Sequence, residues 1–310
     1  MEFNHTSVLL RETVDGVVQN PDGIYVDCTL GGAGHAHAVG EKLSPKGMIV
    51  GLDQDEDALG VARKRLSDLT CQVMTIPTNF ANLKQALTDK GITEVDGFIF
   101  DLGVSSYQLD TPNRGFSYMN DGPLDMRMDK SAPITAEYVV NHYAPDELHR
   151  ILREYGEERW AKRIVEFIVA AREENAITTT GELVSIIKKA IPAKTRQDGP
   201  HPAKRTFQAI RIEVNRELEI LHDSFVDAVS LLKPGGRIGV ITFHSLEDRI
   251  TKQTFKELST GCICPPELPM CVCHHVATVK AKNKAIEPSP EEVELNPRSR
   301  SAKLRIAIKI

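Results

Sequence analysis

Short apolar runs alternate with amphipathic stretches over the first hundred residues of the chain. Four runs have the composition of buried strands, and the segments after them repeat apolar residues at helical spacing. Such alternation predicts a parallel sheet with right-handed crossovers. The predicted strands are residues 24–29, 48–53, 72–76 and 95–101, and the predicted helices are 35–43, 55–69 and 81–89.

The alternation stops after residue 102 and resumes only near residue 237. Residues 103–132 have the composition of loops, and four helical patterns and a basic loop at 192–205 follow them. The helical patterns cover 134–141, 145–155, 158–174 and 180–190; a long helix is predicted at 206–232, a strand at 237–243, a helix at 246–258 and a last strand at 302–310. We therefore predict an α/β fold with a Rossmann-like core, residues 1–107 and 206–310, interrupted by a helical insertion at 108–205 that recognises the substrate.

A glycine-rich loop follows the first predicted strand and indicates a cofactor pocket. Glycine allows the backbone to approach a ligand closely, and Gly31, Gly32 and Gly34 lie in this loop. Ala33 stands where the dinucleotide fingerprint requires its second glycine, so the loop suits a nucleoside cofactor without phosphates, such as S-adenosylmethionine. The alternative interpretation is a tight turn beside an ordinary solvated aspartate.

Acidic residues end three of the predicted strands. Asp53 is expected to accept hydrogen bonds from two ribose hydroxyls, although it could instead cap the following helix. Asp27 and Asp101 fall at or near two other strand ends. Because the carboxyl ends of parallel strands form one edge of a sheet, we expect the three carboxylates to share a pocket.

Composition places the chain among globular proteins and limits its partners. The 310 residues are 41% apolar and 26% charged, and the net charge of −5 excludes a globally basic surface as the basis of nucleic-acid binding. No apolar run approaches a membrane span, and the first residues lack the features of a signal peptide. We expect a cytoplasmic protein with no membrane partner, whose six cysteines are thiols or metal ligands.

Nine sequence blocks along the whole chain resemble the bacterial ribosomal small-subunit RNA methyltransferase H family, also called MraW. The blocks are HTSVLL (5–10), TLGGAGH (29–35), DLGVSSYQLD (101–110), RGFS (114–117), GPLDMRM (122–128), YGEER (155–159), RTFQAIRI (205–212), FHSLEDR (243–249) and NPRSRS (296–301). The resemblance implies a Rossmann-like methyltransferase core with a helical insertion. It also implies S-adenosylmethionine-dependent methylation of cytidine N4 in the decoding region of 16S ribosomal RNA.

The resemblance also implies a set of cofactor contacts. They are Ala33, Gly34, His35, Asp53, Phe80, Asp101 and Gln108. Phe80 could pack against the adenine or simply belong to the core, and His35 could equally be a structural histidine. Ala36 stands where the family usually has serine, a change worth about 1 kcal/mol if one hydrogen bond is lost.

The residues that act on the RNA are harder to assign. The cytosine amine is a weak nucleophile, and Asp101, Ser105 and Ser106 are candidates to hold it, with cofactor orientation the first expectation for Asp101. The candidate RNA contacts are Arg114, Phe116, Lys204, Arg205 and His244, where His244 could instead anchor Glu247 or Asp248. The expected partner is 16S rRNA or the small ribosomal subunit; a homodimer is a further expectation.

Four cysteines form two C-x-C pairs near the end of the chain. They are Cys262, Cys264, Cys271 and Cys273. Four thiols could hold a structural zinc ion, although C-x-C is tighter than the usual C-x₂-C spacing and free or redox-sensitive thiols are the alternative. No catalytic metal is expected, because methyl transfer has no water to activate.

Two other classes of protein share part of this pattern. An NAD-dependent oxidoreductase has the same strand and acid arrangement, but the broken glycine fingerprint argues against it. A non-enzymatic RNA-binding or assembly factor with a vestigial cofactor pocket is the second alternative.

Overall fold

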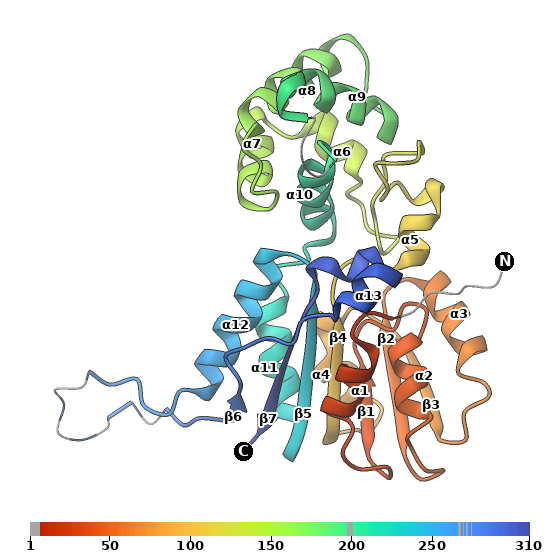
Figure 1. The fold of residues 1–310 in the computed structure, drawn as a ribbon, viewed down its shortest axis with the longest axis vertical. Coiled ribbons are helices and arrows are strands. Elements are labelled where there is room, and N and C mark those ends of the chain that lie inside the picture. Colours follow the sequence, from red (N-terminus) through yellow and green to blue (C-terminus); the bar gives the residue numbers. More distant parts are fainter. Residues whose placement is uncertain (1–6, 197–200, 266–267, 269, 271, 274) are drawn as a thin grey trace. The chain divides into compact units, whose positions relative to one another are not determined.

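The computed structural model describes residues 7–196, 201–265, 268, 270, 272, 273 and 275–310. The chain forms two compact units. Unit 1 comprises Met1–Gly103 and Leu218–Ile310, and unit 2 comprises Val104–Glu217. Each unit has its own hydrophobic core. Figure 1 shows the helices and strands of both units.

Unit 1 is built on a seven-stranded sheet with the order β3-β2-β1-β4-β5-β7-β6. The first five strands pair in parallel, and β7 pairs antiparallel with both β5 and β6. The strands are β1 (Ile24–Asp27), β2 (Met48–Asp53), β3 (Gln72–Pro77), β4 (Val95–Asp101), β5 (Leu232–Thr242), β6 (Val279–Ala281) and β7 (Lys303–Lys309). The order reverses between β1 and β4, which places the expected ligand crevice at their carboxyl ends.

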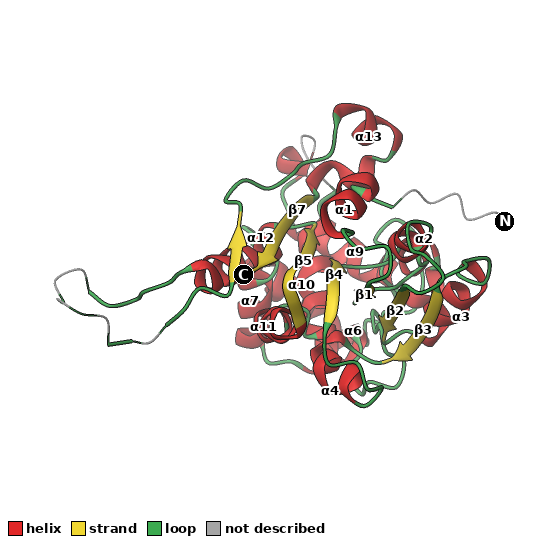
Figure 2. Cartoon of the chain, turned by 90° about the horizontal axis from the view of Figure 1, so that it is seen from below, coloured by secondary structure: helices red, strands yellow, loops and turns green. Residues whose placement is uncertain are grey.

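Helices cover both faces of this sheet (Figure 2). One face carries α1 (Leu10–Val17), α2 (Gly34–Gly40) and α3 (Glu56–Arg65), and the other carries α4 (Leu83–Thr88), α11 (Leu221–Leu231) and α12 (Ser245–Ser259). Alternate residues of the central strands feed the two cores: Tyr25 lies in one and Val26 in the other. Strands buried on both faces read as continuous apolar runs, which is why the sequence revealed them.

Unit 2 is helical. Its helices are α5 (Ser106–Asp110), α6 (Ala136–His142), α7 (Pro145–Glu154), α8 (Ala161–Glu174), α9 (Thr180–Ala190) and α10 (Lys204–Asn215). The amphipathic faces of α6 to α10 meet in one core that includes Leu148, Ile164, Leu183 and Ile210. Thr179 and Glu182 form the capping box that starts α9 at the predicted residue.

The single helix predicted at 206–232 was wrong. The structure has two helices there, α10 and α11, separated by Arg216 in the left-handed region at φ 52°. The Asn215 amide donates to the carbonyls of Met126 and Arg211 and its oxygen accepts from the Met128 N–H, which fixes the end of α10. Apolar spacing continues through the break, so the pattern did not show it. The two units accordingly divide at Gly103 and Glu217, rather than at the residues expected from the sequence.

Several short elements were not predicted. They are α1, α5, β6 and α13 (Pro290–Leu295), together with the 3₁₀ turns η1 (Phe80–Asn82), η2 (Pro112–Arg114), η3 (Ala193–Arg196) and η4 (Pro297–Ser301). Their length gives too few residues for a periodic pattern to stand out. Within the described residues, none of the helices has the length and apolar character needed to cross a membrane.

Candidate functional site

The loop after β1 has an unusual backbone. Gly31 has φ 47°, and Ala33, which caps the start of α2, has φ 58° and is fully buried. A non-glycine residue in this region carries strain, and such strain is retained where the surrounding structure imposes it. A Cβ on Gly34 would overlap Ser7 Oγ, so the loop has little room for side chains there.

Asp53 closes this loop from the end of β2. Its Oδ2 accepts the Gly31 N–H at 2.7 Å, and its Oδ1 accepts the Asp55 N–H at 2.8 Å. Burial raises the pKa of Asp53 to about 6, against the lowering effect of these two N–H donors. A carboxylate fixed in this way beside a glycine loop is suited to accept hydroxyl hydrogens from a ribose.

Asp27 and Asp101 are joined through Thr29. The Asp101 N–H donates to Thr29 Oγ1 at 2.6 Å, and the Thr29 N–H donates to Asp27 Oδ1 at 3.1 Å. Asp27 is only 2% exposed, and burial raises its pKa to about 6. The predicted meeting of strand-end acids is therefore observed, since Asp53 and Asp101 both act electrostatically on Asp27. The role of Thr29 was missed; its position two residues after an aspartate is the signal that could have shown it.

The His35 ring lies between two acceptor groups. Its Nε2 lies 3.0 Å from the Val8 carbonyl oxygen and its Nδ1 lies 3.4 Å from Asp101 Oδ2. Burial lowers the pKa of His35, but the carboxylates of Asp101 and Asp27 outweigh it, and the net pKa is raised. Because both ring nitrogens face acceptors, the protonated imidazolium is the form that satisfies both contacts.

One acceptor of the cluster is left over. Asp101 Oδ1 is buried, and no donor among the described residues reaches it. Buried polar atoms are nearly always hydrogen-bonded, so an unpaired carboxylate oxygen at the end of β4 is a position for a ligand donor.

Phe80 lies in η1, after β3. Its ring packs edge-on against Phe100 with 5.6 Å between centroids, and the side chain is half-buried. Asn79 caps this turn and donates from its amide to Gln54, the residue after Asp53. Phe80 is therefore part of the core on one side, and its remaining exposed surface is available to an adenine.

Gln108, Ser105 and Ser106 belong to unit 2. Ser105 Oγ accepts the Gln108 N–H at 3.2 Å, and Gln108 Oε1 accepts the Ser105 N–H at 3.1 Å. This capping box begins α5 and buries Gln108. The Ser105 hydroxyl therefore caps the start of α5.

Arg114 and Phe116 lie inside unit 2, which does not fit the prediction that they face RNA. Arg114 donates to the carbonyls of Arg127 and Met128, and its guanidinium lies 5.8 Å from the Phe116 ring centroid. Phe116 is 4% exposed and belongs to the helical core. A ring that is covered by its own unit has no face open for a base.

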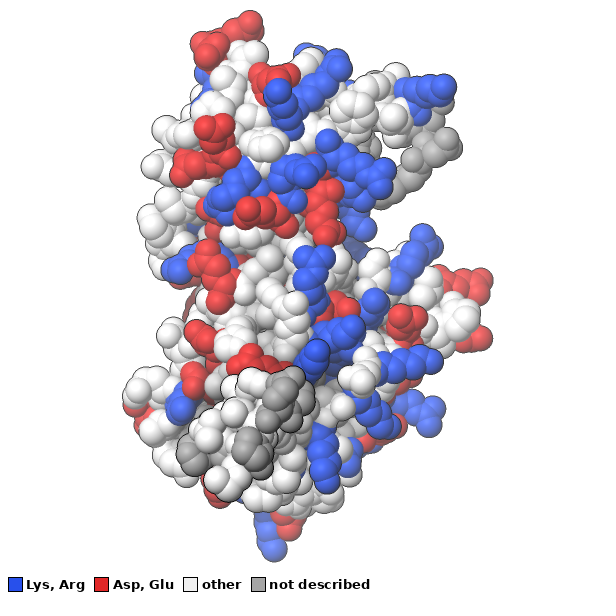
Figure 3. Space-filling model, turned by 90° about the vertical axis from the view of Figure 1, so that its left-hand side faces the viewer, with Lys and Arg blue, Asp and Glu red and all other residues white. Residues whose placement is uncertain are grey.

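Lys204 and Arg205 are exposed at the start of α10, and Arg205 donates to the Glu157 carbonyl. On the face drawn in Figure 3, lysine and arginine side chains are interspersed with aspartate and glutamate side chains. On this face, positive charge therefore occurs in local groups rather than as a continuous basic surface.

His244 follows β5 and lies against Glu247. Its Nε2 is 3.1 Å from Glu247 Oε1, and Glu247 accepts the N–H groups of Phe243 and His244. Glu247 is 2% exposed. Of the two roles that the sequence left open for His244, the structure supplies the contact with Glu247.

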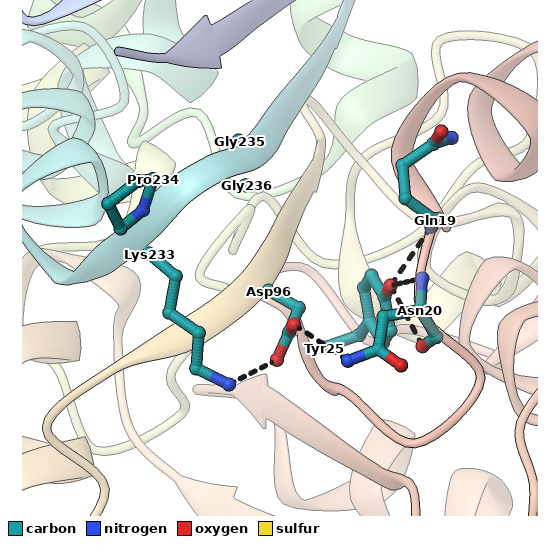
Figure 4. A pocket seen from close by; sticks show the side chains of 8 residues that line it. All are labelled: Gln19, Asn20, Tyr25, Asp96, Lys233, Pro234, Gly235 and Gly236. Carbon is teal, nitrogen blue, oxygen red and sulfur yellow. Dashed lines mark hydrogen bonds and ion pairs between the residues drawn. The ribbon is translucent and has the colours of Figure 1, made fainter.

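The opposite end of the sheet has a small hollow of about 210 Å³ (Figure 4). Asp96 there accepts from Lys233 Nζ at 2.8 Å, from the Ile24 N–H at 3.0 Å and from the Asn20 amide at 3.2 Å. The Tyr25 hydroxyl accepts the N–H groups of Gln19 and Asn20. These polar groups satisfy one another and connect the beginnings of β1, β4 and β5.

The sheet topology, the glycine loop and the acidic strand ends define a Rossmann-like methyltransferase, as the sequence predicted. The chain matches the MraW methylase family over residues 2–310, and it belongs to that family. Methyltransferases of this family use S-adenosylmethionine, so the predicted cofactor is confirmed.

Close relatives cover the full length of the chain. A protein of Clostridioides difficile (strain 630) named "Ribosomal RNA small subunit methyltransferase H" is 56% identical over 311 residues, which is 100% of both chains. A protein of the same name from Clostridium botulinum (strain Kyoto / Type A2) is also 56% identical with the same coverage. This similarity shows the family along the whole chain.

Proposed function

We propose that this protein transfers a methyl group from S-adenosylmethionine to the N4 amine of a cytidine in the decoding region of 16S ribosomal RNA. The names of the two full-length relatives support ribosomal small-subunit RNA as the substrate. The observation that carries the proposal in the structure is the acidic cluster at the carboxyl ends of β1, β2 and β4.

The residues of the acidic cluster and of the glycine loop have distinct roles in this proposal. Asp53 accepts the ribose hydroxyls, and the loop from Gly31 to Gly34 gives the nucleoside a close backbone surface. When bound, the cofactor supplies a sulfonium methyl group that is electrophilic enough for direct displacement. The main contribution of the protein is then alignment of the methyl group with the incoming nitrogen.

Asp101 has two tasks in this proposal. Its unpaired Oδ1 first receives an N–H of the methionine end of the cofactor, and His35 holds Oδ2 in place. The Asp101 carboxylate would also hold an amine hydrogen of the cytosine, which concentrates charge on the attacking nitrogen. When the amine nitrogen takes the methyl group it would lose one hydrogen as a proton, and the Asp101 carboxylate would accept that proton.

Methyl transfer to isolated small subunits tests this function. Unmethylated subunits and naked 16S rRNA are incubated with radiolabelled S-adenosylmethionine, and the RNA is digested to nucleosides for mass spectrometry. We expect label in N4-methylcytidine. Label in another nucleoside would reject the N4 assignment, and an absence of transfer to both substrates would reject the enzyme.

Two variants make the test specific to the cluster. Asp53→Ala should abolish transfer at limiting cofactor, while Asp96→Asn, at the other end of the same sheet, should retain it. Equal losses in both variants would mean that the effect comes from the fold and not from the cofactor site.

A further inference from the structure

Three cysteines meet in the segment that connects α12 to β6. The sulfur atoms of Cys262, Cys264 and Cys273 all lie within 4.8 Å of one another. Cys273 lies eleven positions after Cys262 in the sequence, so the cluster brings together two separate parts of the segment. Cys271 lies outside the described residues, and the other three thiols form the candidate site.

The described residues of this segment form no core that could hold this arrangement. None of its described residues from 261 to 277 is buried, and Ile263, Met270 and Val272 are 62%, 77% and 65% exposed. Figures 1 and 2 show its described residues in a long loop that extends beyond α12 and β6. Its base is closed by the Thr278 N–H, which donates to the Leu258 carbonyl at 2.8 Å. Small regions without a core commonly depend on a metal or a disulfide for their structure.

The separation of the sulfur atoms fits a shared metal ion better than a disulfide. Cys262 Sγ and Cys273 Sγ are 3.8 Å apart. Sulfurs at two corners of a tetrahedron around zinc, each at about 2.3 Å from the ion, are separated by about 3.8 Å. A disulfide instead requires a separation of about 2.05 Å and joins only two of the three thiols.

A backbone donor also faces the cluster. The Val272 N–H donates to Cys264 Sγ at 3.4 Å. Such hydrogen bonds to sulfur orient metal-bound thiolates and stabilise their negative charge. Thiolate ligands favour soft or borderline cations, and zinc is the borderline cation that prefers tetrahedral sulfur coordination.

We propose that Cys262, Cys264 and Cys273 bind a structural zinc ion that folds the segment between α12 and β6. The site lies outside the acidic cluster, and the inference does not depend on the proposed function. The role is structural, because the ion orders a chain segment that has no apolar core.

Metal content tests the proposal directly. The untagged full-length chain is purified under reducing conditions without added metal and analysed by mass spectrometry of the elements. We expect about one zinc ion per chain. Cys262→Ser and Cys273→Ser should each lower this content at least tenfold, while Cys71→Ala, which removes a buried thiol elsewhere in unit 1, should leave it unchanged.

Cobalt substitution then identifies the ligands. The cobalt form should show sulfur-to-cobalt charge-transfer absorption, which weakens in Cys264→Ser. Binding of S-adenosylhomocysteine checks that each variant remains folded. A folded wild-type chain without stoichiometric metal would overturn the proposal. So would a Cys262–Cys273 disulfide, seen as two missing thiols in a titration of denatured protein that was purified without reductant. Metal that stays at wild-type content in the three cysteine variants would also overturn it.

Discussion

The two ends of the sheet in unit 1 use the same residue types in opposite ways. At the amino end, Asp96 receives donors from Lys233, Ile24 and Asn20. Burial alone would raise the pKa of Asp96, but these hydrogen bonds outweigh burial and the net pKa is lowered. At the carboxyl end, burial raises the pKa values of Asp27 and Asp53 to about 6.

This difference separates a structural carboxylate from one that is available to a ligand. Asp96 gains from folding, because its charge is better stabilised in the native protein than in the unfolded chain. The carboxyl-end cluster is under-satisfied, with a buried Asp101 oxygen that no described donor reaches and a strained backbone at Ala33. Under-satisfied groups of this kind cluster at functional sites. The hollow beside Asp96 is therefore a weaker indicator of function than the unpaired carboxylate oxygen of Asp101.

The largest expected effect is on cofactor binding in Asp53→Ala. Loss of two hydrogen bonds to a charged acceptor, each worth about 1.5–3 kcal/mol, should weaken binding of S-adenosylhomocysteine at least about 100-fold. Isothermal titration calorimetry measures this change, with circular dichroism as the check on folding. Binding within a few-fold of wild type would remove Asp53 from the site.

Asp96→Ala should lower the stability of the protein and leave its cofactor affinity unchanged. It leaves the Ile24 N–H and Lys233 without their acceptor, and we expect a loss of about 2 kcal/mol in the free energy of unfolding. Urea denaturation measures the loss, and calorimetry should show an unchanged affinity for S-adenosylhomocysteine. A large loss of affinity in a folded Asp96→Ala protein would contradict the assignment of this end as structural.

The pKa of Asp53 predicts how cofactor binding depends on pH. In the empty protein the carboxyl ionises at about pH 6, and only the ionised form accepts both ribose hydroxyls. Affinity for S-adenosylhomocysteine should therefore be constant above that pH and fall about tenfold per unit below it. Asp53→Asn cannot titrate and is the control; the same acid dependence in this variant would assign the effect to another group.

The free energy of unfolding should respond to pH in the opposite direction to the cofactor affinity. Because the folded pKa of Asp27 is raised from 3.8 to about 6, the folded state binds more protons than the unfolded state between these values. The contribution of Asp27 to stability therefore falls as pH rises through this window. Urea denaturation of wild type and Asp27→Asn at pH 4 and pH 7 should show the smaller pH dependence in the variant; equal dependence would contradict the assignment.

The smallest effect concerns the glycine loop. Gly34→Ala should lower stability by about 1 kcal/mol, because its Cβ meets Ser7 Oγ, whereas Gly32→Ala, with open space around its Cβ, should stay within about 0.5 kcal/mol. Thermal unfolding of the two variants measures the contrast. Equal stabilities would show that the loop has more room than its backbone indicates.

The sequence predicted the sheet better than the contacts within the site. Strands such as Met48–Asp53 and Val95–Asp101 were found at their observed bounds, because strands buried on both faces leave long apolar runs. The break at Arg216 was not visible, since arginine is not a residue type that marks a left-handed position in a sequence. The pairing of His35 with Asp101 joins residues 66 positions apart, and no local pattern records such a contact.

The most direct test of the central claim is a crystal structure of the protein with S-adenosylhomocysteine. We expect the ribose hydroxyls within hydrogen-bond distance of the Asp53 carboxylate, and an N–H of the ligand that donates to Asp101 Oδ1. A ligand bound at the amino end of the sheet, or one that leaves both carboxylates without a contact, would contradict it.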